Sequence, residues 1–168
     1  MTDHLVGEPL IGALLRMPVD AIRCRILEDL HAAGFSDVVP AHFAVWRYPG
    51  PQGRRPSELA LEAGITKQAM NYLLGELETA GYLIRKPDPA DGRSRQVELT
   101  ERGRALLRAL RRTVAAIEHE VAQDLGVERL DELRSLLRAL NATSLVSGFR
   151  ESTGQPALLR TASNPGPG

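Results

Sequence analysis

The fold is set by residues 55–103, which read RPSELALEAGITKQAMNYLLGELETAGYLIRKPDPADGRSRQVELTERG. Apolar residues recur every three or four positions in its first part, which predicts helices over 56–63 and 67–80. Gly64 suits the position just after the first helix, and Thr66 is a good N-cap for the second. Two helices joined by so short a glycine-containing turn are typical of a helix-turn-helix.

A β-hairpin is predicted directly after these helices. The apolar period changes beyond Gly81, and short strands are expected at 82–86 and 95–99. The residues between them are rich in Pro, Asp, Gly and Ser, which favour turns. Thr100 then caps a long helix, which Gly126 ends, and a last leucine-rich helix follows. We therefore predict a mainly α protein with a small β-hairpin wing.

The flanking segments are predicted to be helical, apart from the C-terminal end. Leucine and isoleucine spacing indicates helix over 5–33, where Pro18 produces either a kink or the start of a second helix. A further helix is expected over 40–48. From about Gly148 the periodicity is lost and Gly, Pro, Ser and Thr accumulate, which predicts a disordered tail.

The helix over 67–80 has a polar face that suits the major groove of DNA. At 100° per residue, Gln68, Asn71 and Tyr72 lie opposite the apolar face, with Lys67 beside them. Asn and Gln can pair bidentately with adenine, and Lys can reach guanine or a phosphate. The simpler interpretation is an amphipathic helix with a solvated outside, but the neighbouring turn and hairpin favour DNA binding.

The predicted wing is basic, and arginines at a hairpin tip suit a narrow minor groove. Asp91 is interpreted as an intramolecular partner that fixes the geometry of one arginine. The alternative is a solvated, charged hairpin without a ligand. The minor-groove candidates are Arg93 and Arg95, and the phosphate candidates are Arg54, Arg55, Arg85 and Lys86.

Composition limits the possible classes of protein without naming one. The chain has 21 basic and 21 acidic residues, so attraction to DNA must come from where the charges lie. Cys24 is the single cysteine, which excludes an internal disulfide framework and a multi-thiolate zinc site. No secretory signal or membrane-spanning run is present, and the four histidines are scattered. We expect a soluble cytoplasmic protein without metal or cofactor, and no enzyme motif is present.

Taken together, these motifs resemble the MarR family of transcriptional regulators over residues 36–126. The wing pattern D-x-R-x-x-x-x-x-L-T is present as Asp91, Arg93, Leu99 and Thr100. The resemblance implies a homodimer on a pseudo-palindromic operator, with half-sites about one turn of the double helix apart. It also implies a repressor that a small molecule or an oxidant releases from DNA.

The resemblance assigns roles to the parts of the chain. By analogy, Thr66 joins Lys67, Gln68 and Asn71 in the major groove, and Arg93 enters the minor groove. The expected parts are an N-terminal helical dimerisation segment (1–35), a winged helix-turn-helix lobe (36–100), C-terminal dimerisation helices (101–147) and the tail (148–168). A winged helix used as a protein-interaction module is the rival interpretation.

Two routes for sensing a signal follow from the same analogy. A small-molecule effector pocket is expected between the dimer helices and the DNA-binding lobe, with His42, Trp46 and Tyr48 as candidate lining residues. Cys24 lies between Arg23 and Arg25, which can activate a thiol as a redox sensor. A lone cysteine on a helix also serves as a small buried apolar residue.

Overall fold

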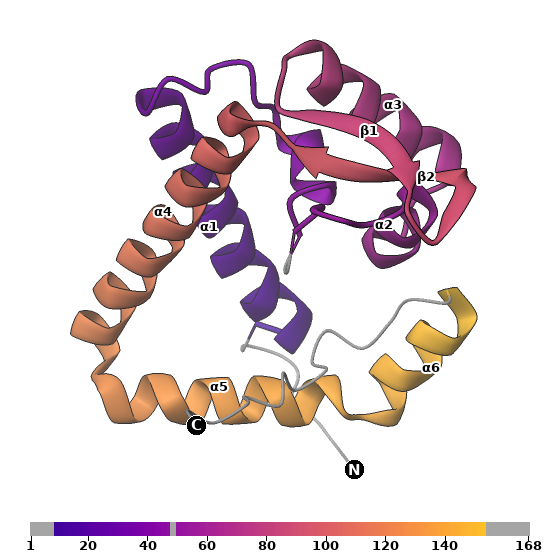
Figure 1. The fold of residues 1–168 in the computed structure, drawn as a ribbon. Coiled ribbons are helices and arrows are strands. Elements are labelled where there is room, and N and C mark those ends of the chain that lie inside the picture. The colour runs from indigo at the N-terminus through magenta and orange to yellow at the C-terminus, as the bar shows by residue number, and fades with distance from the viewer. Residues whose placement is uncertain (1–8, 48–49, 154–168) are drawn as a thin grey trace, which may run out of the picture.

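The computed structural model describes residues 9–47 and 50–153, and they are mainly helical with one two-stranded antiparallel sheet (Figure 1). This confirms the predicted fold class. In chain order the elements are α1 (Ile11–Ala32), η1 (Pro40–Ala44), α2 (Pro56–Ala63), α3 (Lys67–Thr79), β1 (Leu83–Asp88), β2 (Asp91–Leu99), α4 (Glu101–Leu125), α5 (Val127–Asn141) and α6 (Ser144–Thr153).

The helix-turn-helix forms as the sequence predicts. Gly64 ends α2 with φ of 67°, a left-handed conformation that side chains other than glycine rarely adopt. The hydroxyl oxygen of Thr66 accepts the backbone N–H of Ala69 at 3.1 Å and so caps the first turn of α3. The short turn thereby holds α2 and α3 in contact with each other.

The wing is longer than its sequence pattern indicates. Leu83 pairs with Leu99 at the base of the hairpin, and Asp88 pairs with Asp91 at its tip. The predicted strands at 82–86 and 95–99 were therefore too short. Backbone pairing continues through the polar residues because it requires no apolar alternation, and a carboxylate oxygen of Asp88 accepts the Ala90 N–H at 2.8 Å to close the turn.

The core joins the winged lobe to α1 and α4. Tyr82, at the start of the hairpin, is fully buried and packs edge-on against Trp46 with ring centroids 6.4 Å apart. The other fully buried large side chains come from five elements and from the segments that follow α1 and η1: Leu30, Val38, Val45, Pro51, Met70, Leu74, Leu77, Leu83, Val97 and Leu106. This core fixes the position of α3 and the wing relative to the long helices.

The long helices extend away from the winged lobe. In Figure 1, α1 and α4 run from the lobe and pack against each other, and α5 turns at Gly126 to lie across their far end. Gly126 has φ of 85°, which permits this sharp change of direction. Within residues 9–47 and 50–153, no helix combines the length and apolarity needed to cross a bilayer.

Two predicted helices differ from those in the structure. Of the helix predicted over 5–33, residues 5–8 lie outside the described residues, and the observed helix begins at Ile11 and continues through Pro18 without a second helix starting there. Pro18 has no backbone N–H, so one carbonyl of the helix lacks its hydrogen-bond donor. This part of α1 is exposed in the single chain. The helix predicted over 40–48 is a short 3₁₀-helix, η1, in which the Val45 N–H donates to the His42 carbonyl at 2.9 Å.

The predicted tail is also partly structured. Residues 148–153 belong to α6, and Gly148 lies inside this helix rather than at its end. A single glycine costs a helix only about 1 kcal/mol, so it is a weak boundary signal. The rest of the predicted tail, 154–168, lies outside the described residues.

Candidate nucleic-acid interface

The outer face of α3 is polar and exposed, as its helical spacing predicts. Met70, Leu74 and Leu77 are buried beneath it. The exposed residues at its N-terminal end are Thr66, Lys67, Gln68, Asn71 and Tyr72. This face adjoins the N-terminus of α3, and the free backbone N–H groups of a helix N-terminus favour a phosphate nearby. This face can therefore present hydrogen-bond donors and acceptors to the edges of bases.

The wing is fastened to α3 through Arg85. Its guanidinium contacts the Glu78 carboxylate at 2.7 and 2.9 Å, and its backbone N–H donates to the same carboxylate at 3.1 Å. A further guanidinium nitrogen lies 3.5 Å from the Asn71 side-chain oxygen. Arg85 thus holds the hairpin at a set orientation to the helix. The sequence pattern did not reveal Glu78 as its partner.

The other phosphate candidates also pair with carboxylates. Arg55 contacts Asp88 at 2.6 Å and so ties the start of α2 to the wing. The Ala90 N–H first, and then Arg55, hold the pKa of Asp88 below its usual range. Arg54 contacts Glu62 at 2.7 Å and Glu58 at 3.2 Å, and Lys86 contacts Glu98 at 2.7 Å. Phosphate contacts remain predictions for all four candidates, which are Arg54, Arg55, Arg85 and Lys86.

Asp91 shapes the tip of the wing through the backbone. One of its oxygens accepts the Arg93 backbone N–H at 3.1 Å, and the other accepts the Ser94 hydroxyl at 2.7 Å. These hydrogen bonds, the Ser94 one foremost, keep the pKa of Asp91 below its usual range. Asp91 was predicted to fix one arginine, and it does so through the main chain of Arg93 rather than its guanidinium.

Arg93 and Arg95 differ in their surroundings at the wing. Among the described residues, the Arg93 guanidinium enters no ion pair, and the residue is exposed. Arg95 is exposed too, and its guanidinium donates to the Arg85 carbonyl oxygen at 3.3 Å. Of the two minor-groove candidates, Arg93 therefore has the more available charge.

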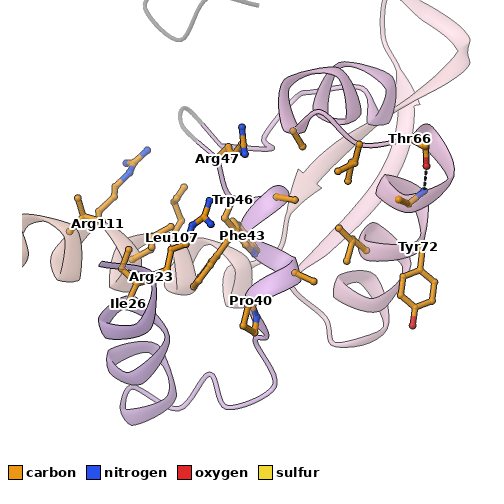
Figure 2. Close-up of a pocket in the computed structure, with 18 of the residues that line it drawn as sticks. Arg23, Ile26, Pro40, Phe43, Trp46, Arg47, Thr66, Tyr72, Leu107 and Arg111 are labelled. Atoms are coloured by element: carbon orange, nitrogen blue, oxygen red, sulfur yellow. Dashed lines mark hydrogen bonds between the residues drawn. The ribbon is translucent and has the colours of Figure 1, made fainter. Parts of the chain in front are cut away.

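A large pocket is lined by residues of α1, η1, α2, α3 and α4, with a volume of about 1310 Å³ (Figure 2). Trp46 lines it, as predicted. His42 does not, because it is buried beside Glu76 at 3.5 Å, and Tyr48 lies outside the described residues. Sequence reasoning missed most of the lining, which includes Arg23, Phe43, Gln68, Leu107 and Arg111.

Cys24 is exposed on α1, so its interpretation as a buried apolar residue is wrong for the single chain. The redox hypothesis for Cys24 stays a prediction. It requires hydrogen peroxide to weaken DNA binding of the wild type and to leave Cys24→Ser unaffected.

No group of three or more His, Cys, Asp or Glu side chains in the described part of the chain is placed to hold a metal ion.

Comparison with known proteins agrees with this architecture. The sequence matches the MarR family over residues 44–94. The HTH-type transcriptional repressor Rv2887 of Mycobacterium tuberculosis (strain ATCC 25618 / H37Rv) is 37% identical over 132 residues, which cover 79% of this chain and 88% of the repressor.

Solved structures of that relative share the fold. The Mycobacterium tuberculosis MarR family protein Rv2887 in complex with salicylic acid has a TM-score of 0.59 and 31% identity, covering 81% of this chain and 99% of that chain. Its complex with DNA has a TM-score of 0.59 and 27% identity, covering 80% of this chain and 100% of that chain. The chain therefore belongs to the MarR family of winged helix-turn-helix transcriptional regulators.

Proposed function

We propose that the protein is a transcriptional repressor that binds a pseudo-palindromic operator as a homodimer and leaves it when a small organic anion binds. The observation that carries the proposal is the rigid attachment of the wing to α3. The Arg85–Glu78 pair sets the polar face of α3 and the tip at Arg93 in one orientation. One subunit can then contact a major groove and the adjacent minor groove together.

The dimer is supported by the apolar surface of the terminal helices. Leu14 on α1 and Leu136 on α5 are 55% and 61% exposed. Monomeric soluble proteins rarely expose contiguous apolar patches of more than a few hundred Å². Further exposed apolar side chains on α1 and α5, and at the N-cap of α1, are Leu10, Ile11, Met17, Val19, Val127 and Leu133. A second copy of the chain that covers these faces brings two α3 helices to half-sites about 34 Å apart.

The organic anion is supported by the pocket and by a relative. Arg23 on α1 and Arg111 on α4 both line the pocket, and neither enters an ion pair within the described residues. Guanidinium groups recognise carboxylates with two parallel hydrogen bonds. The Mycobacterium tuberculosis relative has been solved with salicylic acid, an aromatic carboxylate. We infer a ligand of the same chemical class for this pocket.

A fluorescence-polarisation titration tests the DNA-binding function. The full chain is titrated against duplex DNA from its own upstream promoter, with a random duplex of equal length as the control. We expect tight binding to the promoter, and an affinity that falls steeply as salt rises because phosphate contacts release counterions. Equal affinity for both duplexes would instead favour a protein-interaction module.

A further inference from the structure

The start of α4 holds the corner where α3 passes into β1. Three successive carbonyl oxygens at this corner accept hydrogen bonds from it. The Arg102 guanidinium donates to the Ala80 oxygen at 3.1 Å. The Thr100 hydroxyl donates to the Gly81 oxygen at 2.6 Å, and the Thr100 N–H donates to the Tyr82 oxygen at 3.1 Å. The C-terminal end of α3 is therefore bound to the long helix.

Arg102 also joins this corner to the segment that follows α1. Its guanidinium contacts the Asp37 carboxylate at 2.8 Å and the Tyr82 hydroxyl oxygen at 3.2 Å, and lies over the Tyr82 ring at 4.5 Å from the centroid. The Tyr82 hydroxyl in turn donates to Asp37. Arg102 thus contacts three separate parts of the chain: the end of α3, the base of the wing and the segment after α1.

A small rotation at this corner has a large effect at the reading end of α3. The helix has 13 residues and is therefore about 20 Å long. Its bound end is at Ala80, whereas Lys67 and Gln68 lie at its far end. A rotation of about 10° at the corner displaces the far end by about 3.4 Å, which is the rise of one base pair. The stiffness of the corner therefore decides whether a dimer distinguishes half-sites whose separation differs by one base pair.

We propose that Arg102 is a positioning residue that fixes the separation of operator half-sites accepted by the dimer. This inference rests on the proposed function. The exposed leucines assigned to the dimer lie on α1 and α5, and α5 crosses the end of α4 that is remote from the lobe (Figure 1). Each α3 is therefore aligned with its counterpart in the second subunit through α4 and the corner that Arg102 holds.

Arg102 is better suited to a test than Thr100. Thr100 also caps α4, so its replacement would disturb that helix as well. The Arg102 side chain is 46% exposed, and ion pairs at the surface contribute little to stability. Removing its guanidinium should therefore change the orientation of α3 and leave the fold intact.

Polarisation with the full chain and a series of duplexes tests this proposal. Each duplex carries the two half-sites of the promoter operator, with up to two base pairs inserted or removed between them. For the wild type, we expect one base pair to lower the affinity about tenfold or more, because the protein or the DNA must be deformed. Arg102→Gln should bind the native spacing within about threefold of the wild type, and should lose less than about threefold for one base pair.

Matched variants show whether the contact itself is responsible. Arg104→Gln removes the same charge from the same turn of α4, but Arg104 pairs with Glu101 and the Leu99 carbonyl oxygen, so it should keep the wild-type spacing profile. Asp37→Ala should relax the profile as Arg102→Gln does, and the double variant should relax it little further, because both changes break one contact. A duplex with a single half-site should bind all these proteins alike.

The possible results separate the positioning role from its alternatives. A spacing profile as sharp in Arg102→Gln as in the wild type would overturn the proposal, and so would a wild type that tolerates every spacing. An equal loss on all duplexes, including the single half-site, would also overturn it, because Arg102 would then contact DNA or support the fold. None of these results contradicts the repressor function. A wild type without preference for the promoter would overturn the proposed function itself.

Discussion

Arg85 and Arg93 carry the same charge on the same hairpin, but their surroundings give them different roles. Arg85 is held by Glu78, with the closest contact at 2.7 Å, and positions the wing. The Arg93 guanidinium has no carboxylate partner among residues 9–47 and 50–153. Of these two arginines, the one whose charge is available to a minor groove is therefore Arg93.

Replacing Arg93 with Ala should weaken promoter binding by about tenfold, because a desolvated contact in a narrow groove is lost. The slope of log Kd against log salt should fall by about one unit. The measurement is polarisation at several salt concentrations. Arg129→Ala, which removes an exposed charge from α5, is the control and should match the wild type. Equal loss in both variants would show that only net charge matters.

Asn71→Ala should relax base preference at one operator position, since the amide pairs with a base edge worth about 1 to 3 kcal/mol of discrimination. Lys67→Ala should instead weaken all sequences alike, as expected for a phosphate contact. Competition with a library of single-base operator variants distinguishes the two patterns. Unchanged specificity and affinity in both variants would mean that α3 does not lie in the major groove.

Tyr82 makes stability depend on pH at the alkaline end. Burial, followed by its hydrogen bond to Asp37, raises the pKa of Tyr82 to about 12, above the unfolded value of about 10. The stabilisation is fully present below pH 10 and is lost as the pH rises towards 12. The stability advantage of the wild type over Tyr82→Phe should therefore shrink over this range in urea unfolding. A gap that stays constant from pH 8 to 11.5 would contradict this.

At the residue scale, the sequence predicts exposure better than it predicts partners. Helical geometry alone placed Gln68, Asn71 and Tyr72 on one polar face, because side-chain direction follows from position along a helix. Ion-pair partners depend on tertiary structure. Arg55 and Asp88 are 33 positions apart, so no local pattern indicates their contact.

At the scale of elements, the packing of α4 depends on a close approach of Gly103 to the Tyr82 backbone that only glycine permits. A Cβ atom on Gly103 would lie 2.0 Å from the Tyr82 carbonyl oxygen, a backbone atom that cannot move aside cheaply. The same Tyr82 carbonyl oxygen accepts a hydrogen bond from the Thr100 N–H at 3.1 Å, which fixes its position. Gly103 thereby sets how closely α4 packs on the base of the wing.

Gly103→Ala should lower the free energy of unfolding by about 3 kcal/mol or more, as expected for overpacking against fixed backbone. Gly75→Ala is the matched control, because it also lies in a helix and nothing lies within 4 Å of its added Cβ. Gly75→Ala should raise stability by up to about 1 kcal/mol. Thermal unfolding followed by circular dichroism compares the two. Similar melting temperatures would show that α4 shifts readily.

At the scale of elements, cap chemistry was more informative than periodicity. Thr66, Thr100 and Gly64 marked helix ends correctly, because each satisfies a backbone requirement of its own. Periodicity was wrong for η1, since a 3₁₀-turn and a short α-helix have similar apolar spacing. It was also wrong at the wing, where strand pairing continues through polar residues to Asp88.

For the whole molecule, the chain has equal numbers of acidic and basic residues, so DNA binding depends on which basic groups lack an acidic partner. The basic groups of Arg54, Arg55, Arg85 and Lys86 near the proposed interface are paired with carboxylates.

Family membership and a regulatory rather than enzymatic function were predicted from the sequence and are confirmed. The location of the pocket was expected from the resemblance, but most of its lining residues could not be predicted, because they come from five elements that meet only in the folded chain.

The proposed dimer predicts that a charge on the terminal helices separates the subunits. Leu14→Asp should raise the dimer dissociation constant by about 100-fold or more, because a carboxylate would be buried without a partner. Leu61→Asp on α2 is the control, since Leu61 is also exposed, at 44%, but lies outside the terminal helices. Light scattering after size exclusion measures both. A Leu14→Asp protein that remains dimeric would place the interface elsewhere.

Sedimentation velocity of the full chain, with and without a promoter duplex at low ionic strength, tests the account most directly. We expect a dimer in the absence of DNA and a complex of two chains on one duplex in its presence. A folded monomer that leaves every duplex unbound would contradict it.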